Sequence, residues 1–230
     1  MTLTRRIENY WDERSADFSR TRRLELDGVD GLAWRDIFKK NLPGNKLKIL
    51  DVGTGAGFFA AILSKLGHKV VGIDMSTKML CEADKNLREL NLHADFKKMN
   101  AQSLNFADET FDVVVTRNLT WTLPDVKAAY REWHRILKFG GVLMNFDSDY
   151  GDKNFFECTK TKITEKLLSE CDFIKNSLII STKRRPMWDF GFLEGLNFSV
   201  RLYEDISHFV HKDSRLSYDS VPLFAIYAVK

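Results

Sequence analysis

About the first 42 residues carry their hydrophobic side chains at helical spacing. Residues 5–20 would form one helix, and its apolar face would consist of Ile7, Tyr10, Trp11 and Phe18. A second helix is predicted over residues 29–41, where apolar positions again recur every three or four residues. The chain is therefore expected to begin with two helices that each have a surface to bury.

The pattern changes near residue 47 to short, almost continuous apolar runs that alternate with amphipathic segments. Such runs are typical of buried parallel strands, and they occur at 47–52, 69–73, 111–116 and, after a turn at Gly140 and Gly141, at 142–147. Helices are predicted at 77–91 and 125–138, the second with Asp125 as its N-cap. Strand and helix in alternation predict an α/β fold, in which helices cover both faces of a mostly parallel sheet.

The alternation stops after residue 149 for a polar, Lys-rich stretch that extends to about 195 and is expected to be mainly helical. Two further strands are predicted at 198–206 and 221–229. About 14 residues without a helical pattern connect them, which favours an antiparallel hairpin over another crossover.

Composition and charge narrow the class of protein. With 230 residues the chain can bury a sizeable core, and we expect one domain. Its 35 Lys and Arg are spread among 32 Asp and Glu for a net charge of +3, so nucleic acid is an unlikely partner. The three cysteines show no CxxC spacing, which predicts neither a disulfide framework nor a metal site. Apolar runs are too short to span a membrane, and a cytoplasmic location is expected.

The segment DVGTGAGFFA, residues 51–60, follows the first predicted strand and places Gly53, Gly55 and Gly57 within five positions. At the carboxyl end of a parallel strand, such a turn lets a nucleotide approach the main chain closely. Counted from Gly55, the spacing satisfies the dinucleotide fingerprint with Ala60 in the last glycine position. The glycine pattern alone therefore leaves NAD open as the ligand.

Two aspartates favour a different ligand. Asp51, at the end of the first strand, would repel a pyrophosphate and attract a cationic group. Asp74 ends the next strand, where its carboxylate can accept two hydrogen bonds from a ribose diol. Together they fit a ligand that has a ribose, a cation and no phosphate, and S-adenosylmethionine (SAM) is such a ligand.

Four separate motifs, in order, make the chain resemble the class I SAM-dependent methyltransferases, in particular small-molecule enzymes of the methyltransferase type 11 kind that open with a YW-D-x-R/A pattern. The matching segments are DVGTGAGFFA, GIDMSTKML, FDVVVTRNLTWTL and LKFGGVLMNFD. The resemblance implies a Rossmann-like, seven-stranded sheet with a C-terminal antiparallel hairpin and SAM as the cofactor. It also implies a single domain over 1–230, with lid helices at about 1–42 and an insertion at about 150–195 that covers the substrate site.

The resemblance assigns the residues around the methionine and ribose parts of SAM. Gly53, Thr54 and Gly55 would line the methionine part, and Asp51 would organise its amino group. Asp74 would hold the ribose hydroxyls.

Around the adenine, Met75 would pack on the ring, and Met79 is assigned to the same site. Asn100 stands where the family often has an acidic residue, and its side-chain oxygen could still accept from the adenine amino group while Ala101 donates from its backbone. Arg117 and Asn118, after the fourth strand, would flank the cofactor and face the acceptor.

For the lid and the acceptor, the sequence leaves a structural and a functional interpretation open at each position. Tyr10 and Trp11 either pack in the core or form a lid over SAM and substrate. Trp121 lies at a strand mouth, where substrate contacts occur, and Asp147 is either a substrate contact or a turn residue. Arg185 and Trp188 could receive an anionic or planar substrate, or form a solvated basic edge.

The sequence therefore predicts transfer of a methyl group from SAM to a small-molecule acceptor by in-line displacement, with release of S-adenosylhomocysteine. No residue is marked as a general base, so the catalytic residues are unknown at this stage. An NAD-dependent oxidoreductase and a non-catalytic, SAM-binding regulatory module are the alternatives.

Overall fold

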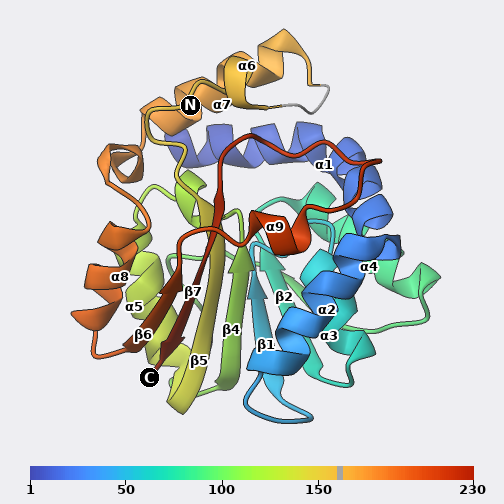
Figure 1. The fold of residues 1–230 in the computed structure, drawn as a ribbon, viewed down its shortest axis with the longest axis vertical. Coiled ribbons are helices and arrows are strands. Elements are labelled where there is room, and N and C mark those ends of the chain that lie inside the picture. Colours follow the sequence, from blue (N-terminus) through green and yellow to red (C-terminus); the bar gives the residue numbers. More distant parts are fainter. Residues whose placement is uncertain (160–162) are drawn as a thin grey trace.

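The computed structural model describes residues 1–159 and 163–230, and its centre is a seven-stranded sheet (Figure 1). The strands are β1 (Lys48–Val52), β2 (Lys69–Asp74), β3 (Asp95–Lys98), β4 (Phe111–Arg117), β5 (Leu137–Ser148), β6 (Ser199–Tyr203) and β7 (Leu223–Val229). Their order is β3-β2-β1-β4-β5-β7-β6. Strand β7 runs antiparallel to its neighbours β5 and β6, and the other neighbouring strands pair in parallel. The predicted α/β class, the seven strands and the antiparallel C-terminal pair are confirmed.

Helices cover both faces of the sheet, as the alternation predicts. One face packs against α2 (Val29–Asn41), α3 (Phe58–Lys65) and α9 (Ser207–Val210), with α4 (Thr77–Glu89) beside α3 and β3. The other face packs against α5 (Val126–Ile136) and α8 (Met187–Glu194). The central strands are buried on both faces, which is why their sequences are continuous apolar runs.

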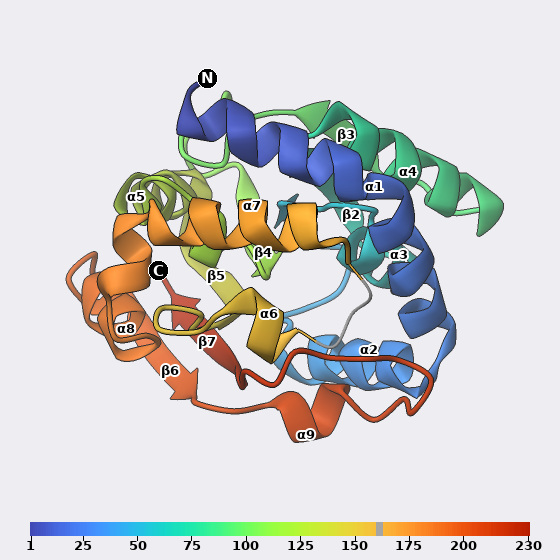
Figure 2. The ribbon, with the colours of Figure 1, turned by 90° about the horizontal axis from the view of Figure 1, so that it is seen from above.

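A third group of helices lies across the carboxyl ends of the strands (Figures 1 and 2). It consists of α1 (Leu3–Asp27), α6 (Phe155–Cys158) and α7 (Glu165–Asn176), with the short helices η1 (Thr120–Thr122) and η2 (Ile179–Thr182) nearby. Arg6 of α1 pairs with Glu170 of α7, and Glu8 of α1 pairs with Lys98 of β3 at 2.6 Å. Polar contacts therefore tie α1 to both sides of the strand ends. Among the described residues, no helix is both long and apolar enough to cross a bilayer.

Local sequence signals set where several helices begin. The Asp125 side chain accepts a hydrogen bond from Ala128 N at 2.9 Å, which confirms the predicted N-cap of α5. Ser76 caps α4 by accepting from Met79 N at 3.0 Å. Residues 150–195 contain α6, α7, η2 and α8, so the expected helical character of this segment is also confirmed outside residues 160–162.

Two features of the strands differ from the sequence prediction. The resemblance implies the seventh strand, but the apolar pattern gave no residue range for it, because β3 pairs only with β2, at the edge of the sheet, and has no buried apolar run. Strand β5 does not begin after a turn at Gly140 and Gly141 but already at Leu137, and the pairing with β4 shifts register there. The glycines mark a bulge inside the strand rather than a turn before it.

The connection between the last two strands also differs. Strand β6 ends at Tyr203, earlier than residue 206, and the segment that follows contains the four-residue helix α9. This helix places Val210 in the core against the α2 face, where it is fully buried. A single apolar turn of this kind is too short to produce a helical period in the sequence.

Candidate functional site

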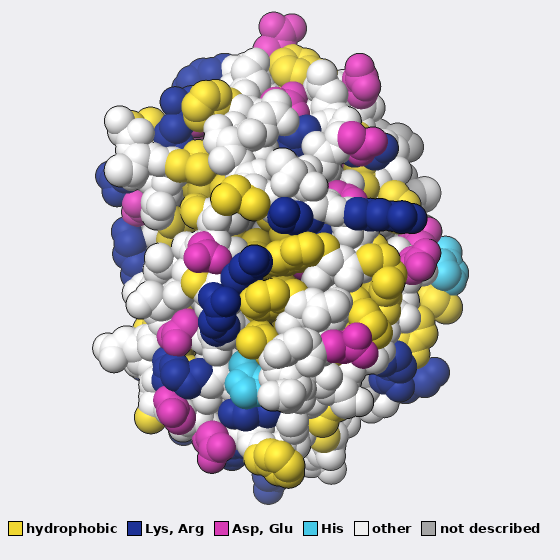
Figure 3. All heavy atoms as spheres, turned by 90° about the vertical axis from the view of Figure 1, so that its left-hand side faces the viewer, with side chains coloured by type: hydrophobic (Ala, Val, Ile, Leu, Met, Phe, Trp, Pro, Cys, Tyr) yellow, Lys and Arg dark blue, Asp and Glu magenta, His cyan; other side chains and the backbone are white. Residues whose placement is uncertain are grey.

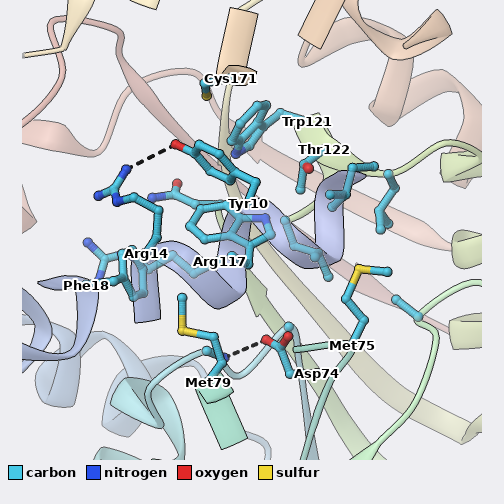
Figure 4. A pocket seen from close by; sticks show the side chains of 18 of the residues that line it. Tyr10, Arg14, Phe18, Asp74, Met75, Met79, Arg117, Trp121, Thr122 and Cys171 are labelled. Carbon is cyan, nitrogen blue, oxygen red and sulfur yellow. Dashed lines mark hydrogen bonds between the residues drawn. The ribbon is translucent and has the colours of Figure 1, made fainter. Parts of the chain in front are cut away.

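A cavity of about 160 Å³ lies at the carboxyl ends of β1, β2 and β4, beneath α1 and α7 (Figure 4). From β1 the sheet continues to β2 in one direction and to β4 in the other, and ligands of open α/β sheets bind where the strand order reverses in this way. A smaller cavity of about 40 Å³ shares part of the lining, namely Phe18, Arg22, Gly53, Arg117 and Asn118.

The glycine loop between β1 and α3 brings bare backbone to the cavity wall. Gly53 and Gly55 have φ angles of +67° and +52°, a region that favours glycine. A Cβ at Gly55 would also lie 3.3 Å from the Phe18 ring of α1, so a side chain there would crowd the helix above. Gly53 and Gly55 both line the larger cavity, as a cofactor site requires.

Asp51 lies directly behind this loop and is almost fully buried. Thr54 Oγ1 donates to Asp51 Oδ2 at 2.6 Å, and Ala60 N donates to the same oxygen at 3.1 Å. Burial raises the pKa of Asp51 to about 7, although these two hydrogen bonds act in the opposite direction. Asp51 and Thr54 line the smaller cavity and not the larger one. Within the described residues, Oδ1 of Asp51 accepts no hydrogen bond, so it can receive one from a ligand.

Asp74, at the end of β2, lines the larger cavity (Figure 4). Its Oδ2 accepts from Gly55 N at 2.9 Å, and its Oδ1 accepts from Ser76 N at 2.8 Å. Burial raises its pKa to about 6, against the effect of these hydrogen bonds. Two backbone N–H groups thus fix the carboxylate, and each oxygen keeps a lone pair for a hydroxyl group of a ligand.

The predicted adenine residues gather beside Asp74. Met75, Met79, Asn100 and Ala101 all line the larger cavity. The Asn100 side-chain oxygen already accepts from the backbone N and the side-chain Nε2 of Gln102, both at 3.0 Å. An adenine amino group would therefore compete with Gln102 for that oxygen.

A buried ionic cluster stands at the other end of the glycine loop. Arg117 Nη2 lies 2.8 Å from Glu25 Oε1, Arg22 pairs with Oε2 of the same residue, and Trp34 Nε1 donates to Glu25 at 3.2 Å. Burial pushes the Glu25 pKa upward, but the two guanidinium groups outweigh it and leave that pKa below its usual value. Nε of Arg22 and both Nε and Nη1 of Arg117 are buried without a hydrogen-bond partner in the described residues. One carboxylate facing two guanidinium groups leaves a net positive charge and free donors for an anion.

Asn118 follows Arg117 and supplies the complementary acceptor. Its φ of +51° lies in the left-handed region, and its backbone N donates to Phe146 O at 2.8 Å. Its side-chain Oδ1 is buried without a partner among the described residues, and Asn118 lines both cavities. Beside the glycine loop, the protein therefore offers acceptors for a cation and donors for an anion.

Aromatic side chains form the part of the larger cavity under α1 and α6. Tyr10 and Trp11 of α1 line it together with Trp121 of η1, and Trp11 meets the Trp121 ring edge-on at 6.5 Å between centroids. Tyr150 and Phe155 continue this wall. Tyr10, Trp11 and Trp121 thus lie where the sequence prediction places lid and substrate contacts.

Two other predicted substrate residues are buried beside the cavity and do not line it. Arg185 Nε pairs with Asp189 Oδ2 at 2.8 Å, and Arg185 Nη1 lies 3.6 Å from Asp147 Oδ2. Asp147 also accepts from Trp121 N at 3.1 Å, and burial raises its pKa. This network supports the short helix that carries Trp121.

Trp188 lies on α8 and outside the lining of both cavities. It stacks on Phe192 at 5.6 Å between ring centroids and an interplanar angle of 10°. The charged groups of Lys127 and Arg131 lie over Phe192 in turn. Figure 3 shows this side of the molecule, where hydrophobic side chains alternate with Lys and Arg.

Sequence reasoning missed several residues of the cavity wall. The largest group is on α1, where Arg14, Phe18 and Arg22 follow Tyr10 at intervals of four residues on the same face. That spacing was a usable signal, because a face that alternates aromatic and arginine side chains is unsuited to a purely apolar core. Tyr150, Phe155, Cys171 and Asp219 come from segments without a motif, and only the folded chain brings them together.

A family model described as a methyltransferase domain matches residues 50–145. The chain is 35% identical over 141 residues to a demethylmenaquinone methyltransferase from Chlorobaculum parvum, covering 59% of this chain and 56% of that protein. It is 33% identical over 111 residues to a phosphatidylethanolamine N-methyltransferase from Cereibacter sphaeroides, covering 45% of this chain and 53% of that protein. The chain thus spans about half the length of these curated relatives.

Solved structures show the same fold at lower identity. A SAM-dependent methyltransferase from Aquifex aeolicus superposes with a TM-score of 0.63 at 21% identity, covering 95% of this chain and 97% of that one. An S-adenosylmethionine-dependent methyltransferase from Mesorhizobium loti also gives a TM-score of 0.63 at 18% identity, covering 88% of this chain and 100% of that one. Residues 50–145 thus match a methyltransferase domain, and the whole chain has the fold of these SAM-dependent methyltransferases.

Proposed function

We propose that this protein transfers a methyl group from SAM to a small organic acceptor and releases S-adenosylhomocysteine. The observation that carries the proposal is the pairing of opposite polar groups beside the glycine loop. Among the described residues, Oδ1 of Asp51 and Oδ1 of Asn118 accept no hydrogen bond there, and Arg22 and Arg117 have donors without a partner. An amino acid zwitterion, such as the methionine part of SAM, matches both signs.

The remaining lining supports the same ligand. Asp74 offers a carboxylate that two backbone N–H groups hold in place for a ribose diol. Met75 and Met79 provide apolar surface beside it for a flat base. The cradle is close-fitting, because Gly53 and Gly55 adopt positive φ and Phe18 lies against the position of a Cβ at Gly55.

When bound, SAM supplies an electrophilic methyl group on its sulfonium. The protein has to hold the acceptor atom in line with that methyl group and to keep water out. Tyr10 and Trp11 on α1 and Trp121 on η1 enclose the cavity for this purpose. A general base is needed only if the methylated atom of the substrate must lose a proton. We assign no residue to that role.

The acceptor side is apolar and aromatic, which suits a small organic molecule. The enclosing helices α1, α6 and α7 correspond to the predicted lid and insertion, and we propose that they select the acceptor. A nucleic acid or membrane partner is not part of the proposal, and the cytoplasmic location stays a prediction from the sequence.

Calorimetric titration of the purified protein with SAM, S-adenosylhomocysteine and NAD tests the cofactor. We expect the first two to bind and Asp74→Ala to abolish their binding. Asp84→Ala is the matched control, because Asp84 lies on α4 in an exposed pair with Arg88 and should leave affinity unchanged. Binding of NAD alone would refute the proposal. Release of S-adenosylhomocysteine in an acceptor screen then separates an enzyme from a non-catalytic SAM-binding module.

A further inference from the structure

We infer that the methyl acceptor is a planar molecule with an anionic group, and that Arg14 binds this anion beside the aromatic wall of the cavity. The inference rests on the proposed function and names the substrate class of that site. Arg14 is then a residue that determines acceptor specificity.

Arg14 is a buried cation without a counter-ion in the described part of the chain. Only 8% of it is exposed, and it lines the larger cavity. Its Nη1 donates to the neutral Tyr10 hydroxyl at 3.1 Å, and its Nε is buried without a partner (Figure 4). A guanidinium group that is removed from water without a carboxylate is unfavourable, and a ligand anion in the cavity would relieve this cost.

The cofactor does not account for this arginine. SAM has one carboxylate, and Arg22 and Arg117 offer their free donors for it beside the glycine loop. Arg14 lies two helical turns before Arg22 on α1 and lines only the larger cavity, not the smaller one that contains Asp51 and Thr54. The Arg14 guanidinium is therefore left to bind the methyl acceptor.

The neighbouring wall favours a planar acceptor. Trp121 lies 5.2 Å from Tyr150 and 5.3 Å from Phe155, and the Tyr150 and Phe155 rings stack at 5.0 Å between centroids. These three side chains are only 6–7% exposed, so their orientation is set by packing before a ligand arrives. Aromatic surfaces of this kind gain most from a flat ring placed against them.

Asp219 is the acidic group on this side of the cavity, and each of its carboxylate oxygens already accepts one hydrogen bond. Its Oδ2 accepts from the Tyr150 hydroxyl at 3.0 Å, and its Oδ1 accepts from Thr159 Oγ1 at 2.7 Å. An amine on the acceptor would share the Asp219 oxygens with these two donors, whereas an anion would meet the Arg14 guanidinium, which has no counter-ion among the described residues. The balance of the site therefore favours an acidic over a basic acceptor. A carboxylate bound by a guanidinium is a weak nucleophile, so the anion is the anchor and another atom receives the methyl group.

The test uses the full-length protein saturated with S-adenosylhomocysteine. Calorimetry measures the binding of 4-hydroxybenzoate, 4-hydroxycinnamate, anthranilate and indole-3-acetate, each beside its neutral amide, and of 4-hydroxybenzylamine. We expect at least one acid to bind about 10-fold or more tightly than its amide, as a charge-assisted pair implies. Arg14→Gln should remove this preference and Arg14→Lys should keep part of it. Affinity for S-adenosylhomocysteine should stay within about threefold, because neither change touches the glycine loop.

Arg20→Gln is the matched control, because Arg20 is an exposed arginine of the same helix, paired with Asp17. Equal affinity for acids and amides, tighter binding of the benzylamine, or failure of every acid to bind would overturn the inference. If Arg14→Gln has the melting temperature of the wild type but binds S-adenosylhomocysteine much more weakly, Arg14 belongs to the cofactor site, and this result would also overturn the inference. If Arg14→Gln does not fold, Arg14→Lys and the wild-type preference decide. Failure of the wild type to bind S-adenosylhomocysteine is a separate result, which refutes the proposed function itself.

Discussion

Replacing Asp51 by asparagine should stabilise the protein at alkaline pH while it weakens cofactor binding. Both internal hydrogen bonds of Asp51, from Thr54 and Ala60, go to Oδ2, so an amide oxygen in that position can keep them. The other oxygen, which we propose accepts from the cofactor ammonium, would become an NH₂ group. The change removes a buried negative charge and turns a ligand acceptor into a donor.

The size of the stability effect follows from the pKa of Asp51. Burial raises it from 3.8 to about 7, so the folded protein binds this proton more tightly than the unfolded chain. The resulting stabilisation is complete below pH 4 and is lost as the pH rises through 7. Between pH 5 and pH 8 the free energy of unfolding of the wild type should therefore fall by about 3 kcal/mol, because about two pH units of this range lie between the unfolded and the folded pKa. Asparagine does not titrate, and the variant should not show this loss.

Urea unfolding of both proteins from pH 5 to pH 8 measures the difference in their free energies of unfolding. The variant should gain about 3 kcal/mol on the wild type across this range. Other titrating groups, Asp74 included, are common to both proteins and largely cancel in the difference. In calorimetry at pH 8, S-adenosylhomocysteine should bind the variant about 10- to 100-fold more weakly. Parallel pH profiles, or an unchanged affinity, would refute the reasoning about this carboxylate.

Three further outcomes are expected. Glu25→Gln should lower the free energy of unfolding, measured in urea, by about 3–5 kcal/mol, because two buried guanidinium groups lose their counter-charge. A loss below about 1 kcal/mol would show that Glu25 does not neutralise them. Gly55→Ala should weaken S-adenosylhomocysteine binding about 10-fold or more in calorimetry, since φ is +52° and the new Cβ would crowd Phe18; wild-type affinity would argue against a close-fitting loop. Cofactor affinity should fall as Asp51 is protonated near pH 7 and fall further below about pH 6, where Asp74 takes up a proton and loses an acceptor for the ribose. Titrations between pH 5 and pH 8 measure this, and the Asp74 prediction fails if the fall persists undiminished in Asp74→Asn.

The matched control for Glu25→Gln is Asp17→Asn on the same helix. Asp17 pairs with Arg20 at 2.9 Å, but both side chains are largely exposed, so the substitution should change stability by less than about 1 kcal/mol. A similar loss in both variants would show that the effect comes from α1 as a whole and not from the buried charges.

Much of the fold could be predicted because its signals are local. A strand buried on both faces needs a continuous apolar run, and such runs located β1, β2 and β4. The glycine loop could be predicted because three glycines lie within five positions. Asp74 could be predicted because it ends the second apolar run. Strand β3 and helix α9 were missed, since an edge strand and a single helical turn need no apolar period. Asp147 was predicted from its place at the end of a strand, and Arg185 and Trp188 from their residue types. None of the three lines either cavity, because Asp147 and Arg185 contact each other and Trp188 stacks on Phe192.

The sequence by itself determined a glycine loop after one strand, an aspartate at the end of the next, and an open parallel sheet that places both at one edge. Tertiary structure decided the rest of the site. Which face of α1 covers the cavity depends on packing and ion pairs with distant elements, and this places Arg14 in the lining of the larger cavity and Arg22 beside Glu25 and the glycine loop. The unpaired charge of Arg14 among the described residues is also a tertiary property, because folding removes the guanidinium group from water and brings no carboxylate of these residues to it.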